Sequence, residues 1–316
     1  MGSFYSQIKS QEIITEMTKS GKLNNPLYED KSLNPATKPA LEILHLITLY
    51  IGPFVEGSSK ELDALLSIVN HNIEFKIVDK ISNALQNAIG TFGVQPSEII
   101  KMQVKFLETL RKSSMLIGGN KSIASCFEIK KEEVTKCLYC EGITTVANEP
   151  SFHFPIILDG SHSSLQGYLY NALASKILKG EEKVECPYCY CKQEAKKFTE
   201  VTSFPDIMIF SIINPNSIKT TYVDMRSLLM HTIEFTGKKV LNAQPQRYEL
   251  IGAVMLSDEG KHVSLLRLEK NWISVSEYYG ITIVEDARLF GCMDPPPQPL
   301  TIVQLVYTKP SLITHK

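Results

Sequence analysis

The stretch VECPYCYCKQEAKK, residues 184–197, places three cysteines within six positions beside a basic run. A second CxxC pair lies upstream in KCLYC, residues 136–140, with 45 residues between the two pairs. Two thiolates with CxxC spacing can hold one metal ion from a tight turn, and two such pairs supply the four sulfur ligands of tetrahedral Zn²⁺. The sequence therefore predicts a structural zinc site. Its expected ligands are Cys137, Cys140, Cys186 and Cys189.

Two other interpretations of these cysteines exist, namely four unligated thiols or one thioredoxin-like redox pair. A redox pair alone leaves the second CxxC unexplained. Cys191 is an alternative ligand to Cys189, but the CxxC spacing favours Cys189. We expect Cys126, Cys191 and Cys292 to be ordinary core or surface thiols. In a reducing compartment, seven cysteines, most of them in CxxC pairs, indicate metal ligation or redox chemistry more readily than structural disulfides.

Length and composition predict a globular protein of the cytosol or nucleus. The chain has 316 residues, 43% of them hydrophobic, which is enough for one large domain or two ordinary ones. With 33 Lys plus Arg against 34 Asp plus Glu, we expect no contact with nucleic acid or an anionic membrane. The N-terminus lacks the pattern of a signal peptide, and the longest apolar run, residues 41–55, is too short and interrupted to span a bilayer.

The periodicity of apolar residues changes along the chain. In the N-terminal third, apolar residues three and four apart predict helices. These helices are expected at residues 10–22, 39–50, 59–70, 73–90 and 96–112. After Cys189 the pattern becomes one of short β-type runs separated by Gly, Asn, Asp and Pro. The clearest runs are residues 206–213, 247–256, 262–269, 280–286 and 301–308. Between them we expect a loop-rich extension, residues 140–186, that the metal clips at its base.

A helical lobe, a zinc-clipped extension and an antiparallel sheet, in that order, resemble the ubiquitin-specific proteases, whose catalytic domain is likened to a thumb, fingers and palm. QPSEIIKMQVKFLETLRKS, residues 95–113, resembles the family's Gln-Asp-Ala-x-Glu-Phe helix. Residues 192–212 resemble the segment after the second zinc knuckle, and residues 247–276 resemble the histidine box. The resemblance covers roughly residues 33–308, and the order of the motifs is more specific than any one of them.

The resemblance implies an α+β protein with the papain-like cysteine-protease fold of the ubiquitin-specific protease type. Residues 1–31 would be an N-terminal extension with an amphipathic helix, and residues 32–316 the protease-like domain. Within it we expect a helical thumb at about 32–125, zinc-clipped fingers at about 126–200 and an antiparallel β palm at about 201–310. The implied partners are ubiquitin or a ubiquitin-like protein and other proteins of a complex.

The family's nucleophile is a cysteine at the start of the first thumb helix, where the helix N-terminus and an imidazole favour its thiolate. The best match to that box, LNPATKPALEILHL, places Lys38 on the cysteine and Leu33 on the oxyanion-stabilising asparagine. No cysteine precedes Cys126 in this chain. A lysine cannot form the thioester intermediate, so the resemblance stops at the nucleophile.

The remaining catalytic positions match unevenly. His262 in EGKHVSLL fits the general-base histidine, and Trp272 fits the tryptophan of the same box or is simply a core residue. The orienting Asp or Asn becomes Ser276 or Glu277. Serine cannot stabilise an imidazolium as a carboxylate does, and the longer arm of glutamate changes the geometry.

The scaffold signals are retained while the reaction signals are not, so we interpret the chain as a pseudoenzyme. It would bind ubiquitin or a ubiquitin-like protein, or serve as a structural subunit of a protein complex. One alternative is an active thiol-dependent deubiquitinase that uses Cys126 or Cys292. A second is a zinc-ribbon adaptor unrelated to ubiquitin, which would have no reason to carry the palm motifs.

Overall fold

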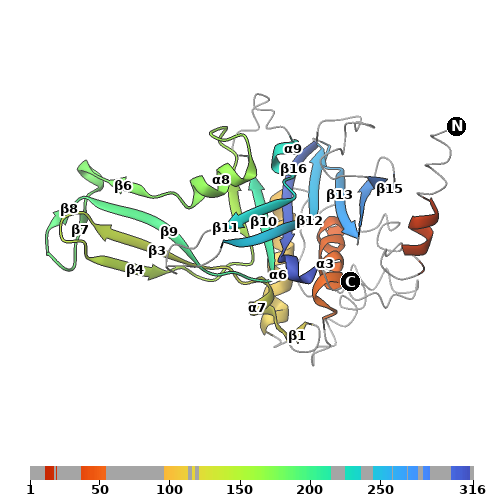
Figure 1. Cartoon of the computed structure of the whole chain (residues 1–316), viewed down its shortest axis with the longest axis horizontal. Coiled ribbons are helices and arrows are strands. Elements are labelled where there is room, and N and C mark those ends of the chain that lie inside the picture. The colour runs from red at the N-terminus through yellow and green to blue at the C-terminus, as the bar shows by residue number, and fades with distance from the viewer. Residues whose placement is uncertain are drawn as a thin grey trace.

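The computed structural model of the chain describes residues 11–17, 19, 37–54, 96–112, 116–117, 121–214, 225–235, 245–257, 259–268, 270–276, 280–284 and 300–313. Helices come first along these residues and strands dominate the C-terminal part, as the periodicity predicts (Figure 1). The helices expected at 59–70 and 73–90 lie outside the described residues, as do Glu277 and Cys292.

Two long helices form the thumb. Helix α3 spans Thr37–Ile51 and helix α6 spans Pro96–Lys112. A proline lies in the first turn of each, where its missing N–H costs no hydrogen bond. In α6, Glu98 in the first turn and two basic residues in the last turn complement the helix dipole. Neither these nor the other described helices combine the length and apolar content needed to cross a bilayer.

The palm is a sheet formed, within the described chain, by eight strands in the order β15-β14-β13-β12-β16-β10-β5, with β11 beside β12. The strands are β5 (Phe154–Ile157), β10 (Ile207–Ile213), β11 (Thr232–Phe235), β12 (Gln246–Ser257), β13 (His262–Leu268), β14 (Asn271–Ser276), β15 (Gly280–Val284) and β16 (Leu300–Thr308). Only the β5–β10 pair is parallel among these described ladders. The central strands are covered on both faces, which explains their near-continuous apolar sequences.

Each face of the palm sheet has its own core. On one face, α3 and α6 pack against apolar side chains such as Ile251 and Ile273. On the other face, Phe210, Tyr248 and Trp272 pack with helix α8 (Leu165–Ala172). Trp272 is 4% exposed. Alternation along a strand sends successive side chains to opposite faces, so one set of strands serves both cores.

The fingers are a second sheet, which extends away from the palm (Figure 1). Its strand order is β4-β3-β9-β6, and a small ladder of β7 with β8 lies at its far end (Figure 1). The bounds are β3 (Lys130–Cys137), β4 (Ile143–Ala147), β6 (Lys176–Leu178), β7 (Val184–Glu185), β8 (Lys192–Gln193) and β9 (Ala195–Ser203). Three residues separate β9 from β10, and over them the chain passes from the fingers to the palm.

The structure corrects the expected form of the extension. The cysteine pairs adjoin the ends of β3 and β7, at the far tip of the fingers and not at their base (Figure 1). Between the pairs, the chain returns to the palm, where it supplies β5 and α8, and then runs out again as β6. The predicted fingers range of 126–200 therefore contains a palm strand. The cause is the parallel pairing of β5 with β10, which requires a long crossover connection.

Short elements complete the domain. Residues 11–17 are helical, and Ile14 and Met17 are buried in the same core as α3, so this helix docks on the domain. The side chain of Ser122 caps helix α7 by accepting a hydrogen bond from the Ser125 N–H. The other short elements are β1 (Leu116–Ile117), β2 (Lys121–Ser122), α7 (Ile123–Phe127), η2 (Gly180–Glu182), α9 (Met225–Leu228) and η4 (Pro310–Leu312).

Candidate functional site

The structure brings the four predicted metal ligands together. The Sγ atoms of Cys137, Cys140, Cys186 and Cys189 all lie within 4.8 Å of one another. Cys140 Sγ and Cys186 Sγ are 3.5 Å apart, which is far beyond a disulfide bond length of about 2.05 Å. A tetrahedron with Zn–S bonds of about 2.3 Å needs sulfur atoms about 3.8 Å apart. The distances between the four sulfur atoms are of this size, so the backbone need not rearrange to bind the ion.

The two CxxC turns are built in the same way. The N–H of Cys137 donates to the carbonyl of Gly142 (2.9 Å), and the N–H of Cys186 donates to the carbonyl of Cys191 (3.0 Å). In each turn the residue after the second cysteine has a left-handed backbone, with φ 58° at Glu141 and φ 55° at Tyr190. Non-glycine residues rarely adopt this conformation, so its use at both equivalent positions shows that the turns are two copies of one knuckle.

This geometry separates the roles of the clustered cysteines. Cys189 supplies a sulfur to the cluster, whereas Cys191 closes the second knuckle through its backbone carbonyl, and its side chain is exposed. The choice of Cys189 made from spacing is therefore consistent with the positions of the sulfur atoms. The two knuckles also pack against each other. The ring of Tyr188 in the second knuckle lies so close to Gly142 in the first that a Cβ at position 142 would clash with it.

Backbone hydrogen bonds also favour the thiolate form of Cys186. The N–H groups of Cys189 and Tyr188 donate toward Cys186 and lower the pKa of its thiol to about 6. A thiol with that pKa is mainly ionised at neutral pH, which is the form that ligates metals. Four sulfur donors, two of them buried, fit Zn²⁺ in a closed structural site, where the ion would fasten the fingertips and take no part in a reaction.

A second constellation lies where thumb and palm meet. Lys38 is in the first turn of α3 and is partly buried. His262 is the first residue of β13, and its Nε2 lies 3.4 Å from Oε1 of Glu42. Glu42 follows Lys38 by four residues and so shares its helix face. Glu42 and His262 are both 0% exposed, so the carboxylate and the imidazole form an ion pair or hydrogen bond sealed from solvent.

This pair dictates what His262 can do. A catalytic base must reach both a nucleophile and a substrate. Here the Nε2 of His262 faces a carboxylate on the thumb helix, and the residue has no solvent-exposed surface. The other oxygen of Glu42, Oε2, is buried and accepts no hydrogen bond from a described residue. The arrangement ties α3 to β13 within the described part of the chain.

A pair of amides reinforces the same junction. Gln103 on α6 and Gln304 on β16 are 1% and 0% exposed, and each donates its amide N–H to the other's carbonyl oxygen. Gln103 also lies 3.4 Å from the backbone carbonyl of Ala40 on α3. Buried amides are stable only when their donors and acceptors are paired, so these residues fix the two thumb helices on the sheet.

The other predicted catalytic positions lie nearby. Ser276 ends β14, is 6% exposed and pairs in register with Val263. Strand alternation puts Ser276 on the face of Val263, whereas the adjacent His262 faces the thumb. Glu277 lies outside the described residues. Trp272 packs in the second core, with its ring 6.4 Å from the ring of His231.

Cys126 has the environment of a core thiol. It lies in α7, is 0% exposed and belongs to the core that the thumb helices share with the sheet. Burial raises the pKa of its thiol above the usual value. A nucleophilic cysteine needs a lowered pKa and access to substrate, so Cys126 has neither property of a catalyst.

Sequence reasoning missed Glu42, Gln103 and Gln304. A signal for Glu42 was present, because it is the one acidic residue in the apolar run PALEILHLITLY. A charge on the buried face of a helix requires a partner. The glutamines gave no such signal, since either could lie on an exposed face of its element.

Comparison with known proteins gives two curated relatives. A protein of Schizosaccharomyces pombe named "Probable ubiquitin carboxyl-terminal hydrolase 9" is 29% identical over 203 residues, which cover 60% of this chain and 33% of the relative. "Ubiquitin carboxyl-terminal hydrolase 9" of Saccharomyces cerevisiae is 25% identical over 163 residues, which cover 49% of this chain and 22% of the relative. The chain thus spans a third or less of the length of either relative. No family model matches it.

Among solved structures, the chain resembles the SAGA DUB module Ubp8/Sgf11/Sus1/Sgf73 bound to monoubiquitin. The TM-score is 0.62, and the match covers 87% of this chain and 66% of the other. The sequences are 14% identical, so this likeness concerns the fold.

Proposed function

This chain is a homologue of the ubiquitin-specific proteases and has their fold; from that premise, we propose that it is a non-catalytic member that binds ubiquitin or a ubiquitin-like protein. The observation that carries the proposal is the sealed contact between Glu42 and His262. It occupies the junction of thumb helix and histidine strand, where the resemblance calls for a thiolate and a solvent-accessible imidazole.

The chemistry of the aligned residues supports the absence of acyl transfer. An ammonium at neutral pH is no nucleophile unless its pKa is strongly depressed. If the amine of Lys38 did take an acyl group, the product would be a stable amide and turnover would stop. The Nε2 of His262 is also engaged by the buried carboxylate of Glu42 instead of facing a nucleophile.

The retained scaffold supports a role in binding. The fingers keep four clustered thiols at their tip and an ordered sheet, and the palm keeps two packed cores. The structural neighbour's title describes a module bound to monoubiquitin and containing several protein chains. A second candidate function, that of a structural subunit in a protein complex, rests on this multi-chain neighbour. The proposed location is the cytosol or nucleus, where a reducing environment keeps metal-ligating thiols reduced.

Labelling with ubiquitin propargylamide tests the catalytic part. This probe forms a covalent bond with a nucleophilic cysteine of a bound deubiquitinase. We expect no adduct by intact-mass measurement, with an active ubiquitin-specific protease labelled in parallel as the control. An adduct that the Cys126→Ser or Cys292→Ser variant abolishes would establish the active-protease alternative instead.

Titration of isotope-labelled ubiquitin with the unlabelled chain tests the binding part. We expect saturable changes in the ubiquitin NMR spectrum. The unrelated zinc-ribbon alternative predicts no change. Absence of binding to ubiquitin and to ubiquitin-like proteins, by a chain that is folded and metal-loaded, would overturn the binding proposal.

A further inference from the structure

Strand β4 borders the fingers sheet, and no strand among the described residues pairs with its outer edge (Figure 1). Its sequence, ITTVA, has four β-branched residues and no charge, proline or glycine. Its ladder with β3 runs through the strand without a register shift. Such residues favour strands, and an exposed edge without charge, proline or bulge is a template for pairing with another chain.

The direction of the backbone decides which groups this edge presents. The N–H of Asn148 donates to the carbonyl of Lys131 on β3 (2.9 Å), and the N–H of Cys137 on β3 donates to the carbonyl of Gly142 (2.9 Å). Bonds to one neighbour come from alternate residues of an antiparallel strand, so the even-numbered residues of β4 bond to β3. The odd-numbered residues therefore direct their N–H and C=O groups outward.

Most of these outward groups are unused within the described chain. The carbonyl of Ile143 accepts a hydrogen bond from the hydroxyl of Tyr188 (2.8 Å). The backbone groups of Thr145 and Ala147 have no hydrogen-bond partner among the described residues on this edge. Backbone N–H and C=O groups at every second residue match the repeat of another β-strand. The chemistry of the edge thus favours an extended chain as its occupant.

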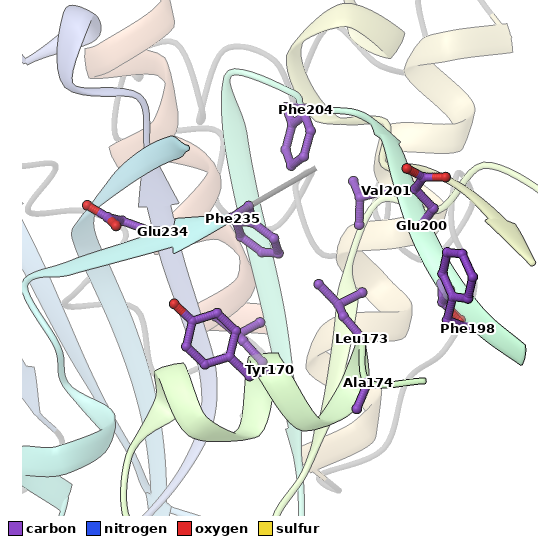
Figure 2. A pocket seen from close by; sticks show the side chains of 11 residues that line it. Tyr170, Leu173, Ala174, Phe198, Glu200, Val201, Phe204, Glu234 and Phe235 are labelled. Atoms are coloured by element: carbon purple, nitrogen blue, oxygen red, sulfur yellow. The ribbon is translucent and has the colours of Figure 1, made fainter. Parts of the chain in front are cut away.

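Three other edges in the described chain are protected against such pairing. Strand β5 contains Pro155, which lacks an N–H, and β6 begins with Lys176, which pairs with Glu182. At β11, helix α8 lies beside the strand, with a pocket of about 150 Å³ between α8, β9 and β11 (Figure 2). The side-chain amide of Gln166 on α8 donates to the backbone carbonyl of Glu234 (2.8 Å) and accepts from its N–H (2.9 Å). It thereby occupies the groups that a further strand would use.

We propose that β4 pairs with β4 of a second copy of this chain, antiparallel about a two-fold axis at Thr145. Thr145 then lies opposite Thr145 of the second copy, and Ile143 lies opposite Ala147. Thr144 lies opposite Val146 on the other face of the sheet. In this register every outward residue meets an outward residue, so the two edges exchange backbone hydrogen bonds. Pairs of threonine and of other β-branched residues are favourable cross-strand neighbours.

The self-complementary edge is what selects a second copy. A two-fold interface uses the same surface patch on both subunits, and an uncharged strand can meet itself without repulsion. Ile143 is 50% exposed and Val146 is 61% exposed, and strand alternation puts them on opposite faces. Pairing covers part of both. The net charge of −1 also gives little repulsion between whole chains. The two fingers sheets become one continuous sheet, separate from the Glu42–His262 junction.

A charge exchange at the two-fold axis tests the pairing by sedimentation of the full chain over a range of concentrations. We expect the wild-type chain to dimerise as concentration rises. Thr145 is exposed, so Thr145→Lys should fold, but it puts two ammonium groups opposite each other and should weaken the dimer about tenfold. Thr145→Glu should do the same with two carboxylates. An equimolar mixture of the two variants should dimerise again, because opposite charges then face each other.

Thr202→Lys is the matched control, since it adds the same charge to an exposed threonine on β9 of the same sheet. It should dimerise as the wild-type chain does. A wild-type chain that stays monomeric, which would leave the edge to a strand of another protein, would overturn the proposal. Equal association of Thr145→Lys and Thr202→Lys would also overturn it, as would a mixture of Thr145→Lys and Thr145→Glu that stays monomeric.

Amide hydrogen exchange, read residue by residue by NMR, locates the contact. Exchange at Thr145 and Ala147 should slow as the protein concentration rises, because their N–H groups are bonded only in the dimer. Thr144 and Val146 bond to β3 in every chain, so their exchange should not change. Dimerisation without slower exchange at Thr145 would place the interface elsewhere and refute the assignment.

Discussion

Cys186 and Cys191 carry the same side chain five positions apart, but the structure gives them different tasks. The sulfur of Cys186 belongs to the four-thiol cluster, and two backbone N–H groups lower its pKa to about 6. Cys191 contributes a backbone carbonyl that any residue could supply. At the scale of the residue, position within the knuckle decides the chemistry.

Matched serine variants test this difference. We expect the wild-type chain to carry one zinc ion per molecule and Cys191→Ser to retain it, because the Cys191 carbonyl is unchanged. Cys186→Ser should lose most of the bound metal and unfold the fingertips at a lower temperature, since metal binding is coupled to local folding. Metal analysis of protein purified without chelator measures the stoichiometry. Equal zinc loss in both variants would contradict the assigned roles.

At the scale of the element, α3 and β13 meet through residues 220 positions apart, Glu42 and His262. Two buried ionisable groups stabilise the fold only as a pair. If one of them is removed, the other stays buried without a partner. The contact explains why a charged residue lies in the apolar face of α3. In our proposal, this contact lies where an active relative would need an accessible thiol and imidazole.

A double-mutant cycle measures the coupling. His262→Leu should lower the free energy of unfolding by about 3 kcal/mol, because it leaves the Glu42 carboxylate buried without its partner. Glu42→Leu together with His262→Leu should be much less costly than the sum of the single changes. Urea unfolding gives the four free energies. Additive effects would show that the pair is not coupled.

A second element-scale contact gives a pH dependence. Asp206, just before β10, lies 2.6 Å from the amine of Lys121 and 3.2 Å from that of Lys309. Burial tends to raise the pKa of Asp206, but the hydrogen bond from Lys121 and the charge and hydrogen bond of Lys309 outweigh it, so the pKa is lowered. The charged carboxylate thus joins β2 and the end of β16 to the start of β10.

The sign of the effect follows from linkage. Because the folded-state pKa lies below the unfolded one, Asp206 contributes stability above about pH 4, which is lost as the pH falls through the folded pKa. Asp206→Asn should therefore cost about 1 kcal/mol at pH 7, and this difference should shrink in acid below about pH 4. Urea unfolding of both proteins at pH 7 and in acid measures it. A difference that is constant with pH would refute the charge-based account.

At the scale of the whole molecule, the palm sheet is a shared layer between two cores. The thumb helices cover one face and α8 covers the other, while the fingers project from one side (Figure 1). A catalytic site built from both the thumb and the palm needs all of its groups correctly positioned. We therefore expect that substituting one residue does not produce activity.

Lys38→Cys tests that conclusion. We expect this variant to show no turnover of a fluorogenic ubiquitin C-terminal amide. His262 would still face Glu42, and the best sequence match has no oxyanion-stabilising asparagine. The loss of one oxyanion donor alone typically slows such reactions by about 100- to 1,000-fold. Turnover by Lys38→Cys above that of the wild-type chain would mean that the His262 imidazole is available.

The sequence by itself determined the features that depend on local spacing. Apolar periodicity gave both long described thumb helices and the main palm strands, and the CxxC spacing gave the four clustered thiols, because a tight turn brings nearby residues together. Motif order gave the fold class. The resemblance also located Lys38 in the first turn of α3 and His262 at the start of β13.

Only the tertiary structure decided what those residues face. The Gln103–Gln304 pair joins residues 201 positions apart, and the pocket assembles α8, β9 and β11. The return of residues 154–172 to the palm placed the knuckles at the tip of the fingers, against expectation. Periodicity records which side of an element is buried, but a contact such as that of Glu42 with His262 depends on how distant elements pack, and no local pattern encodes that.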